Sequence, residues 1–465
     1  MTFPAYPEYK DSDVEWLGEV PAHWEVKALK FCASWNDEVL PESMPPEETI
    51  HYVEISDVEV GKGILRTQKM SFNDAPSRAR RIVREGDVVV STVRTYLKAI
   101  ARISGLPKDT VVSTGFAVVR PQSEQVSSLF LGYLLQSDGF VSELIASSVG
   151  VSYPAINASD LVGFPVALPP HEEQATIGLF LDHETARIDA LIEEQQRLIE
   201  LLKEKRQAVI SHAVTKGLDP DVPMKDSGVE WLGEVPAHSD MAKFKYAIAE
   251  FEQGWSPQCD NEPVGSIDEW GVLKVGCVNH GVFDPAENKR LPDELEARPE
   301  LTVREDDLLV SRANTRELVG SAAQVPADQP NLMASDKLFI VRLHYKICRP
   351  RFAAAYLGDH RVRHQIELEA TGASSSMLNI GQAAIRELCV PLPPEVEQDR
   401  IVEELDKREA GFEALERETA FHIQLLNERR SALISAAVTG KIDVRDWTPP
   451  ASSAEPDHEA EGAVT

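Results

Sequence analysis

The stretch Lys10-Asp11-Ser12-Asp13-Val14-Glu15-Trp16-Leu17-Gly18-Glu19-Val20-Pro21-Ala22-His23 occurs twice in this chain of 465 residues, the second time with one change between Lys225 and His238. Two further stretches also return later in the chain, Val166–Gln174 as Val390–Gln398 and Arg206–Thr215 as Arg430–Thr439. The spacing is far longer than the 20 to 50 residues typical of a solenoid repeat. The repeat therefore predicts two copies of one domain with pseudo-twofold organisation.

Between these anchors the two halves match only in pattern. Gly86–Ser91 corresponds to Asp306–Ser311, and Phe116–Arg120 corresponds to Leu338–Arg342. The motifs that frame each domain are therefore repeated, whereas the sequence between them differs in the two copies.

Each copy combines short strands with a shorter helix, which predicts an α+β fold. The strand signals are β-branched runs bounded by Gly, Pro, Asp and Asn. They cover Ile50–Ile55, Asp87–Val93 and Gly115–Arg120 in the first copy, and Val272–Val278, Asp307–Ser311 and Leu338–Leu343 in the second. Helices are expected at Leu129–Gln136 and Arg351–Glu369.

A long helix is predicted after each module, at Glu172–Ala213 and at Glu395–Ala437, each beginning after a Pro-Pro pair. At 1.5 Å per residue, roughly 40 residues form a rod of about 60 Å. Apolar residues at heptad spacing predict that the two rods pair as an antiparallel coiled coil. The alternative is that both are core helices of one large domain. The predicted seam consists of Ile177, Leu181, Ile188, Leu191, Leu198, Leu202 and Val209, and of Ile401, Leu405, Phe412, Leu415, Leu426 and Leu433.

These signals divide the chain into five segments. They are a first module with its N-terminal segment (1–170), a central helix (171–216), a second module (217–394), a C-terminal helix (395–440) and an acidic tail expected to be disordered (441–465).

No catalytic or metal-binding constellation is evident in the sequence. The five cysteines are scattered and lack a C-x-x-C pair, and His360 and His364 lack the glutamate of a zincin helix. Neither a phosphate-binding loop nor an Asp/Asn-Pro-Pro-aromatic loop occurs. The chain has no membrane-spanning run and no signal peptide, so we expect a cytoplasmic protein.

The formal charge of −29 opposes nucleic-acid binding, yet positive charge is concentrated locally. Residues 78–120 contain nine Lys/Arg against three Asp/Glu, and residues 337–363 contain seven against one. We expect DNA contacts, if any, within these stretches.

The repeated motifs resemble those of type I restriction-modification specificity subunits. The resemblance rests on Tyr9–Trp24, on Leu168-Pro169-Pro170 with Gln174, Ile177, Leu181 and Asp182, and on Arg206–Gly217. One departure is Ser239-Asp240, where the first copy has Trp24-Glu25; it puts the packing of that segment in doubt.

The resemblance implies that each module is a target-recognition domain for one half of a bipartite double-stranded DNA sequence. The two helices would separate these domains and dock two modification subunits. The resemblance also implies that S-adenosylmethionine, ATP and Mg²⁺ belong to the modification subunits and to the restriction (motor-nuclease) subunits. This chain would bind no cofactor and catalyse nothing itself.

Arg and Lys can grip phosphates or read guanine, and Asn can read adenine. The candidate DNA-contacting residues are therefore the basic and polar residues beside strands: Arg94, Lys98, Ser113, Thr114, Ser152 and Tyr153, with Arg312, Asn314, Arg316, Lys337, Ser374, Ser375 and Ser376. Two alternatives are a coiled-coil scaffold that binds only proteins, and an enzyme with unfamiliar motifs.

Overall fold

The computed structural model describes residues 3–374 and 377–449, and its internal contacts divide the chain into two units. Unit 1 combines residues 1–195 with 421–465, and unit 2 comprises residues 196–420. The helices α4 (His171–Lys216) and α8 (Glu395–Val438) each belong in part to both units. No helix of the described residues is long and apolar enough to cross a membrane.

Between residues 3 and 170, unit 1 contains fourteen strands and three α-helices. They are β1 (Tyr9–Asp11), β2 (Glu19–Pro21), β3 (Glu25–Ala28), β4 (Ala33–Trp35), β5 (Thr49–Val53), β6 (Val58–Glu59), β7 (Gly63–Ile64), β8 (Gln68–Ser71), β9 (Ala79–Ile82), β10 (Val88–Ser91), β11 (Ile100–Arg102), β12 (Thr110–Ser113), β13 (Phe116–Pro121), α1 (Ser128–Gln136), α2 (Asp138–Ala146), α3 (Ala158–Leu161) and β14 (Pro165–Leu168).

Unit 2 follows the same plan between α4 and α8. Its elements are β15 (Met224–Asp226), β16 (Glu234–Pro236), β17 (Asp240–Lys243), β18 (Ile248–Gln253), β19 (Gly271–Leu273), β20 (Asn288–Arg290), β21 (Leu308–Ser311), β22 (Ala313–Asn314), β23 (Ala322–Gln324), β24 (Leu332–Ala334), β25 (Leu338–Leu343), α5 (Pro350–Leu357), α6 (His360–Glu369), β26 (Thr371–Ser374), β27 (Met377–Asn379), α7 (Gln382–Glu387) and β28 (Cys389–Leu392).

The central sheet has the same strand order in both units. It runs β11-β10-β13-β4 in unit 1 and β18-β25-β21-β23 in unit 2, which is the same order read from the other end. A second sheet also corresponds, because β5 pairs parallel with β12 and β19 pairs parallel with β24. The repeated sequence framework thus forms a repeated α+β fold, and the expected fold class is confirmed.

The central strands contain continuous apolar runs, such as Val88–Val90 and Leu308–Val310, because both faces of the sheet are covered. In unit 1, Val88 and Val90 pack against the helices while Val89 packs against the second sheet. In unit 2, Leu308 and Leu309 divide between two cores in the same way. Alternate strand residues point to opposite faces, so a continuous apolar run places this sheet in the middle of three layers.

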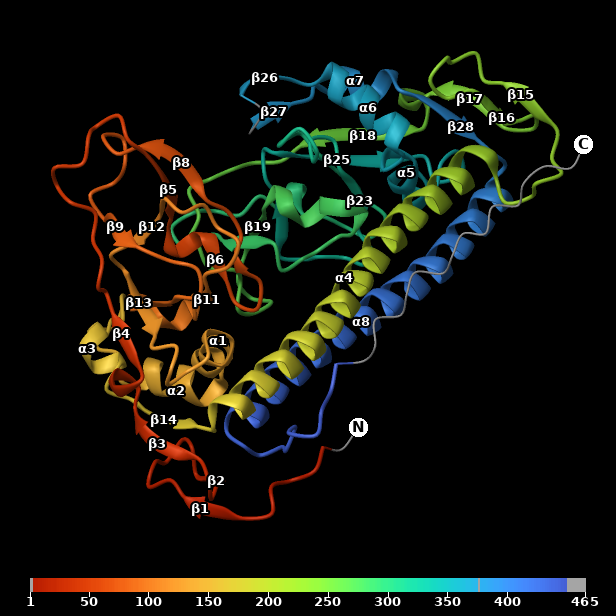
Figure 1. The fold of residues 1–465 in the computed structure, drawn as a ribbon. Helices are drawn as coiled ribbons and strands as arrows, with labels where there is room; N and C mark the ends of the chain where they lie inside the picture. Colours follow the sequence, from red (N-terminus) through yellow and green to blue (C-terminus); the bar gives the residue numbers. More distant parts are fainter. Residues whose placement is uncertain (1–2, 375–376, 450–465) are drawn as a thin grey trace, which may run out of the picture. The chain divides into compact units, whose positions relative to one another are not determined.

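The helices α4 and α8 run antiparallel. In unit 1, Arg430 of α8 donates to Asp189 of α4 at 3.0 Å. In unit 2, Arg206 of α4 lies 3.6 Å from Glu409 of α8. Figure 1 shows the two helices side by side.

The heptad register predicted for these helices is wrong in part. Leu191 and Leu198 are 46% and 41% exposed, and Leu415 is 48% exposed. The neighbouring Ile192 and Ile199 lie on the half-buried side instead. The sequence has apolar residues at adjacent positions there, so spacing alone did not distinguish the two registers.

Several predicted seam residues belong to the globular cores. Ile177 and Leu181 are fully buried in the main core of unit 1, and Ile401 and Leu405 are buried in that of unit 2. Of the remaining predicted residues, Ile188 and Leu202 are buried, whereas Val209, Phe412, Leu426 and Leu433 are half-buried.

Each repeated N-terminal segment packs on the end of a long helix. In unit 1 the Tyr9 hydroxyl donates to the Gly440 carbonyl at 3.0 Å, just after α8. In unit 2 the Lys216 ammonium, at the end of α4, donates to the Glu234 carbonyl at 2.7 Å. Ser239, which replaces Trp24, is 1% exposed and keeps the same backbone turn, so this departure does not disturb the segment.

The repeated Pro-Pro-x-x-x-Gln motif fastens the start of each long helix to its module. The Gln174 amide accepts a hydrogen bond from the Ser127 amide (2.7 Å) and donates to the carbonyls of Gln125 (3.1 Å) and Pro169 (2.9 Å). Gln398 makes the equivalent three bonds, to the Arg349 amide and to the carbonyls of Ile347 and Pro393. Both glutamines are 1% exposed.

Two further expectations need correction. The single helix expected at Arg351–Glu369 is two helices, α5 and α6, because Asp359 caps the second by accepting from the backbone of Arg361 and Val362. The tail expected to be disordered from residue 441 begins with a packed segment. Val444 is 2% exposed and Trp447 packs edge-on against Phe180; residues 450–465 lie outside the described residues.

Candidate nucleic-acid interface

Three loops of unit 1 meet beyond the end of β10. The Thr92 amide and hydroxyl both donate to the Gly115 carbonyl, at 2.8 and 2.9 Å. The Arg94 amide donates to the Pro154 carbonyl at 2.7 Å, and the Thr95 hydroxyl donates to that of Ser148 at 2.9 Å. These contacts hold residues 92–98, 113–115 and 148–155 together as one surface.

The first of these loops has an unusual backbone. Arg94 and Lys98 flank the 3-10 turn Thr95–Leu97, and both adopt left-handed conformations with φ of 51° and 53°. A residue with a side chain is strained there by about 1–2 kcal/mol. Observed strain of this kind is concentrated at functional sites. The buried Thr95 between them maintains the conformation, since its hydroxyl is hydrogen-bonded.

The Arg94 side chain is stacked on an aromatic ring. Its guanidinium carbon lies 4.9 Å from the centroid of the Tyr153 ring, and Tyr153 is 66% exposed. Arg94, Lys98, Thr114 and Ser152 are exposed as well. Four predicted residues therefore lie with Tyr153 on one solvent-facing surface, which we call the Arg94 surface (residues 92–98, 114 and 149–155).

Unit 2 builds the corresponding surface with other side chains. The Arg312 amide donates to the Lys337 carbonyl at 2.8 Å, just as the Thr92 amide donates to the Gly115 carbonyl. Asn314 pairs with Leu378 in the sheet β22-β27-β26. Arg312 and Asn314 are half-buried, while Lys337 and Arg316 are exposed. The Asn314 carboxamide accepts from the Thr315 amide at 2.9 Å.

Not every predicted contact residue is accessible. Ser113 is 3% exposed, and its hydroxyl accepts from the Gly115 amide at 3.3 Å, so it supports the loop junction. Ser374 ends β26, and Ser375 and Ser376 lie outside the described residues.

Several cations of the two basic stretches form ion pairs within the framework. In unit 1, Arg120 forms ion pairs with Asp87 (2.8 Å) and Glu38 (3.0 Å), Arg78 pairs with Glu54, and Arg84 pairs with Glu38. In unit 2, acidic partners engage Arg342, Arg349, Arg351 and Arg361. Arg94 and Lys98 form no ion pair within the described chain, and both are exposed beside the junction of the three loops, so they can reach an external phosphate or base.

Exposed apolar side chains beside Arg94 were missed by the sequence analysis. Tyr96 and Leu97 are 52% and 44% exposed, and Val149 and Val151 are exposed as well. The available signal was an aromatic residue between two cations, at Arg94-Thr95-Tyr96-Leu97-Lys98. Such side chains contact thymine methyl groups or stack on bases in protein–nucleic-acid interfaces.

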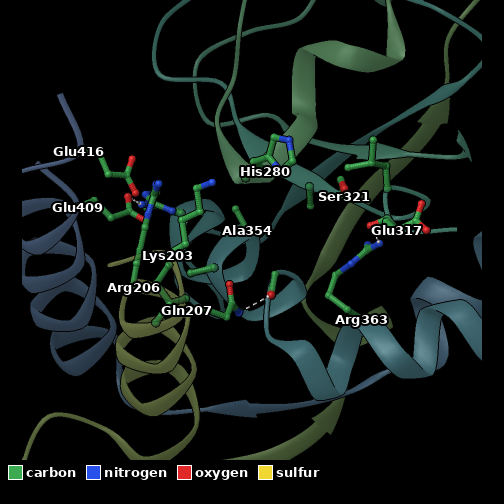
Figure 2. Close-up of a pocket in the computed structure, with 17 residues that line it drawn as sticks. Lys203, Arg206, Gln207, His280, Glu317, Ser321, Ala354, Arg363, Glu409 and Glu416 are labelled. Atoms are coloured by element: carbon green, nitrogen blue, oxygen red, sulfur yellow. Dashed lines mark hydrogen bonds and ion pairs between the residues drawn. The ribbon is translucent and has the colours of Figure 1, made fainter. Parts of the chain in front are cut away.

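Unit 2 also contains a cavity of about 490 Å³ between α4, α5 and α8. Figure 2 shows Lys203, Arg206, Glu409 and Glu416 on the side of the long helices, with His280 opposite them. Arg206 is paired with Glu409, and the Gln207 side chain donates to the Gly358 carbonyl at 2.8 Å.

The equivalent place in unit 1 is filled. Tyr133 and Gln136 of α1 correspond to Ala355 and Gly358, and only about 170 Å³ remains there. Burial, followed by the hydrogen bond to Asp182 (2.6 Å), raises the pKa of the Tyr133 hydroxyl. Arg430 closes the gap by donating to the Gly61 carbonyl at 3.0 Å. The cavity of unit 2 thus follows from two smaller side chains, and its charges largely neutralise one another, so we assign it no ligand.

No cluster of three or more His, Cys, Asp or Glu side chains suited to a metal ion was found in residues 3–374 and 377–449. The surfaces described above consist of cations, hydroxyls, amides and aromatic rings. These groups are suited to binding phosphates and base edges.

The fold and its two polar surfaces define a two-module protein joined by long helices. Residues 60–202 match the family model described as the type I restriction modification DNA specificity domain. The chain is 28% identical over 214 residues to the type I restriction enzyme EcoEI specificity subunit of Escherichia coli, which is 46% of this chain and 36% of that protein. It is 24% identical over 343 residues to the EcoKI specificity subunit of E. coli strain K12, which is 72% of this chain and 70% of that protein.

A solved structure shares the fold. It was described in work on complex assembly and conformational transition of the type I R-M system, and it matches with a TM-score of 0.68 and 22% identity over 90% of this chain and 98% of that one. In sequence, the chain is thus similar to type I restriction enzyme specificity subunits, and residues 60–202 match their DNA specificity domain.

Proposed function

We propose that this chain is the sequence-reading subunit of a type I restriction-modification complex, in which each unit reads one half of a bipartite double-stranded DNA target. One observation carries the proposal: the same loop junction is built twice, with Arg94 in one copy and Asn314 in the other. To recognise a DNA target whose two half-sites differ in sequence, two domains can share one fold but must present different side chains to the bases. Because the matched family model is a DNA specificity domain, a scaffold without DNA readout is not favoured.

The partners and cofactors form part of the proposal. Two modification subunits would supply S-adenosylmethionine chemistry, and restriction subunits would supply ATP- and Mg²⁺-dependent cleavage. This chain would act in the cytoplasm as the non-catalytic subunit. Its negative net charge is compatible with this role if its partners complete the positive surface around the DNA.

The long helices offer apolar side chains for partner docking. Leu198, Leu201 and Leu415 in unit 2 are 41%, 50% and 48% exposed. In contrast, Ile401 and Leu405 are buried in the core and are unsuited to docking. We expect Leu198→Glu with Leu415→Glu to weaken co-purification with a modification subunit, whereas Glu200→Gln, a substitution on the same exposed helix, leaves it unchanged.

DNA methylation mapping by single-molecule sequencing tests the function. Cells expressing the modification subunit are compared with and without this chain. A bipartite motif with a fixed gap, methylated only when the chain is present, is the expected result. Unchanged methylation would favour a protein scaffold, and methylation or cleavage by the purified chain alone would show an enzyme.

A further inference from the structure

Among the cations of residues 78–120, Arg94 alone combines three features in the described structure. It is exposed, its backbone is left-handed, and its guanidinium lies over the Tyr153 ring. A phosphate contact requires only a positive charge within reach, which Lys98 next to it supplies. The strained backbone of Arg94 and the stacking of its planar guanidinium on Tyr153 also fix the orientation in which the N–H groups point.

The internal repeat supplies a second, independent observation. Ser91 pairs with Phe116 in unit 1 as Ser311 pairs with Leu338 in unit 2, so Ser91 and Ser311 are equivalent. Three residues further along the chain, Arg94 of unit 1 is therefore equivalent to Asn314 of unit 2. Both side chains can read a base bidentately, Arg with guanine through O6 and N7 and Asn with adenine through N6 and N7. The two units therefore place different base-reading side chains at the same position of the framework.

We propose that Arg94 determines specificity by reading one guanine of the half-site bound by unit 1, with Tyr153 holding the guanidinium in its reading orientation. The inference rests on the proposed function. Tyr153 acts as a positioning residue: its ring limits the orientations of the fork and leaves the N–H edge free for the base. The Arg94–Pro154 hydrogen bond (2.7 Å) keeps the two loops, and therefore the stack, in register.

The test uses the full chain expressed with its modification subunit, and the methylated motif is mapped for each variant. Arg94→Lys keeps the charge and removes the planar fork. Arg94→Asn introduces the residue of the other unit, and Asn tolerates the left-handed backbone, so the loop should still fold. Tyr153→Phe keeps the ring and Tyr153→Ala removes it. Arg84→Lys, at an exposed ion pair of the same stretch, is the matched control.

We expect the wild-type motif to contain a G·C pair in one half-site that becomes degenerate in Arg94→Lys and Arg94→Asn. Discrimination at that pair should fall roughly 5- to 150-fold, while the other half-site and the gap stay as they were. Tyr153→Ala should lower discrimination at the same pair, whereas Tyr153→Phe and Arg84→Lys should not. Thermal melting of each purified variant should remain close to that of the wild type, since both side chains are exposed.

Three results would overturn the inference. They are an unchanged motif in Arg94→Lys, a uniform loss of methylation with no degenerate position, which marks a phosphate contact, and degeneracy at an A·T pair. If the wild-type chain directs no motif-dependent methylation at all, the proposed function itself fails. That failure is recognised before any variant is compared.

Discussion

Replacing Gln174 by methionine should release the start of α4 from the module of unit 1. The change conserves side-chain length and removes the carboxamide. Ser127 would then bury an amide without a partner, which costs about 1–3 kcal/mol. Each of the two carbonyls that lose a donor adds about 0.5–1.5 kcal/mol. Methionine recovers part of this by burying apolar surface, so the expected loss is about 2–4 kcal/mol.

Hydrogen exchange read by mass spectrometry measures this loss locally. Protection of the amides in α1 and in the first turns of α4 should fall roughly 30- to 900-fold, since 1.4 kcal/mol corresponds to a factor of ten. Gln398→Met should produce the same change at α5 and the start of α8, because it removes the same three bonds.

Gln196→Met, at an exposed position of α4, is the matched control and should leave protection unchanged. A fall of less than about fivefold in Gln174→Met would mean that the buried carboxamide contributes little, because fivefold corresponds to about 1 kcal/mol. The explanation of the repeated motif as a structural fastener would then be refuted.

Three other perturbations have clear expected outcomes. Tyr133→Phe removes a hydroxyl that donates to a carboxylate of α4 and should lower the unfolding free energy of unit 1 by about 1–2 kcal/mol in urea titrations. Gly440→Ala places a methyl group against a proline ring at a left-handed position and should cost about 2–4 kcal/mol, whereas Gly411→Ala, in an open helical position, should stabilise by about 0.5–1 kcal/mol. Burial raises the pKa of Cys32 to about 11 and also raises the pKa of Cys259, but only Cys259 is partly accessible, so iodoacetamide at pH 8 should modify Cys259 faster than Cys32 in peptide maps. The stabilisation by the protonated Cys32 thiol should be present below about pH 9 and be lost as the pH rises toward 11.

The sequence predicted the α+β modules and their central strands because those strands carry a clear signal. Val88, Val89 and Val90 are buried on both faces of the sheet, and a continuous β-branched run at that length indicates such a strand. The long helices were equally clear, but their contact face was not. Leu191-Ile192 and Leu198-Ile199 each offer two adjacent apolar positions, and only the partner helix decides which one is buried.

The sequence located the loop that forms the candidate site, but it did not show which of the cations in that stretch are available to bind DNA. Local charge located the loop that contains Arg94, but charge alone did not separate Arg94 from Arg120. Arg120 donates two hydrogen bonds to the buried Asp87, a residue distant in sequence. That distinction depends on tertiary pairing, which a count of cations does not contain. The left-handed backbone at Arg94 and Lys98 was also invisible, since neither residue type signals it.

The repeat explains why the two ends of the chain fold together. In unit 2 the segment after α4 packs on the end of that helix, and the connection is local in sequence. Unit 1 requires the same contact, but the helix end available to its N-terminal segment is that of α8, which lies 431 residues along the chain from Tyr9. The contact of Tyr9 with Gly440 therefore joins the two ends of the chain within unit 1, as the contact of Lys216 with Glu234 joins neighbouring segments within unit 2. In each unit these framework contacts lie apart in sequence from the loop that contains Arg94 or Asn314, so the loop residues can differ between the units while the framework is kept.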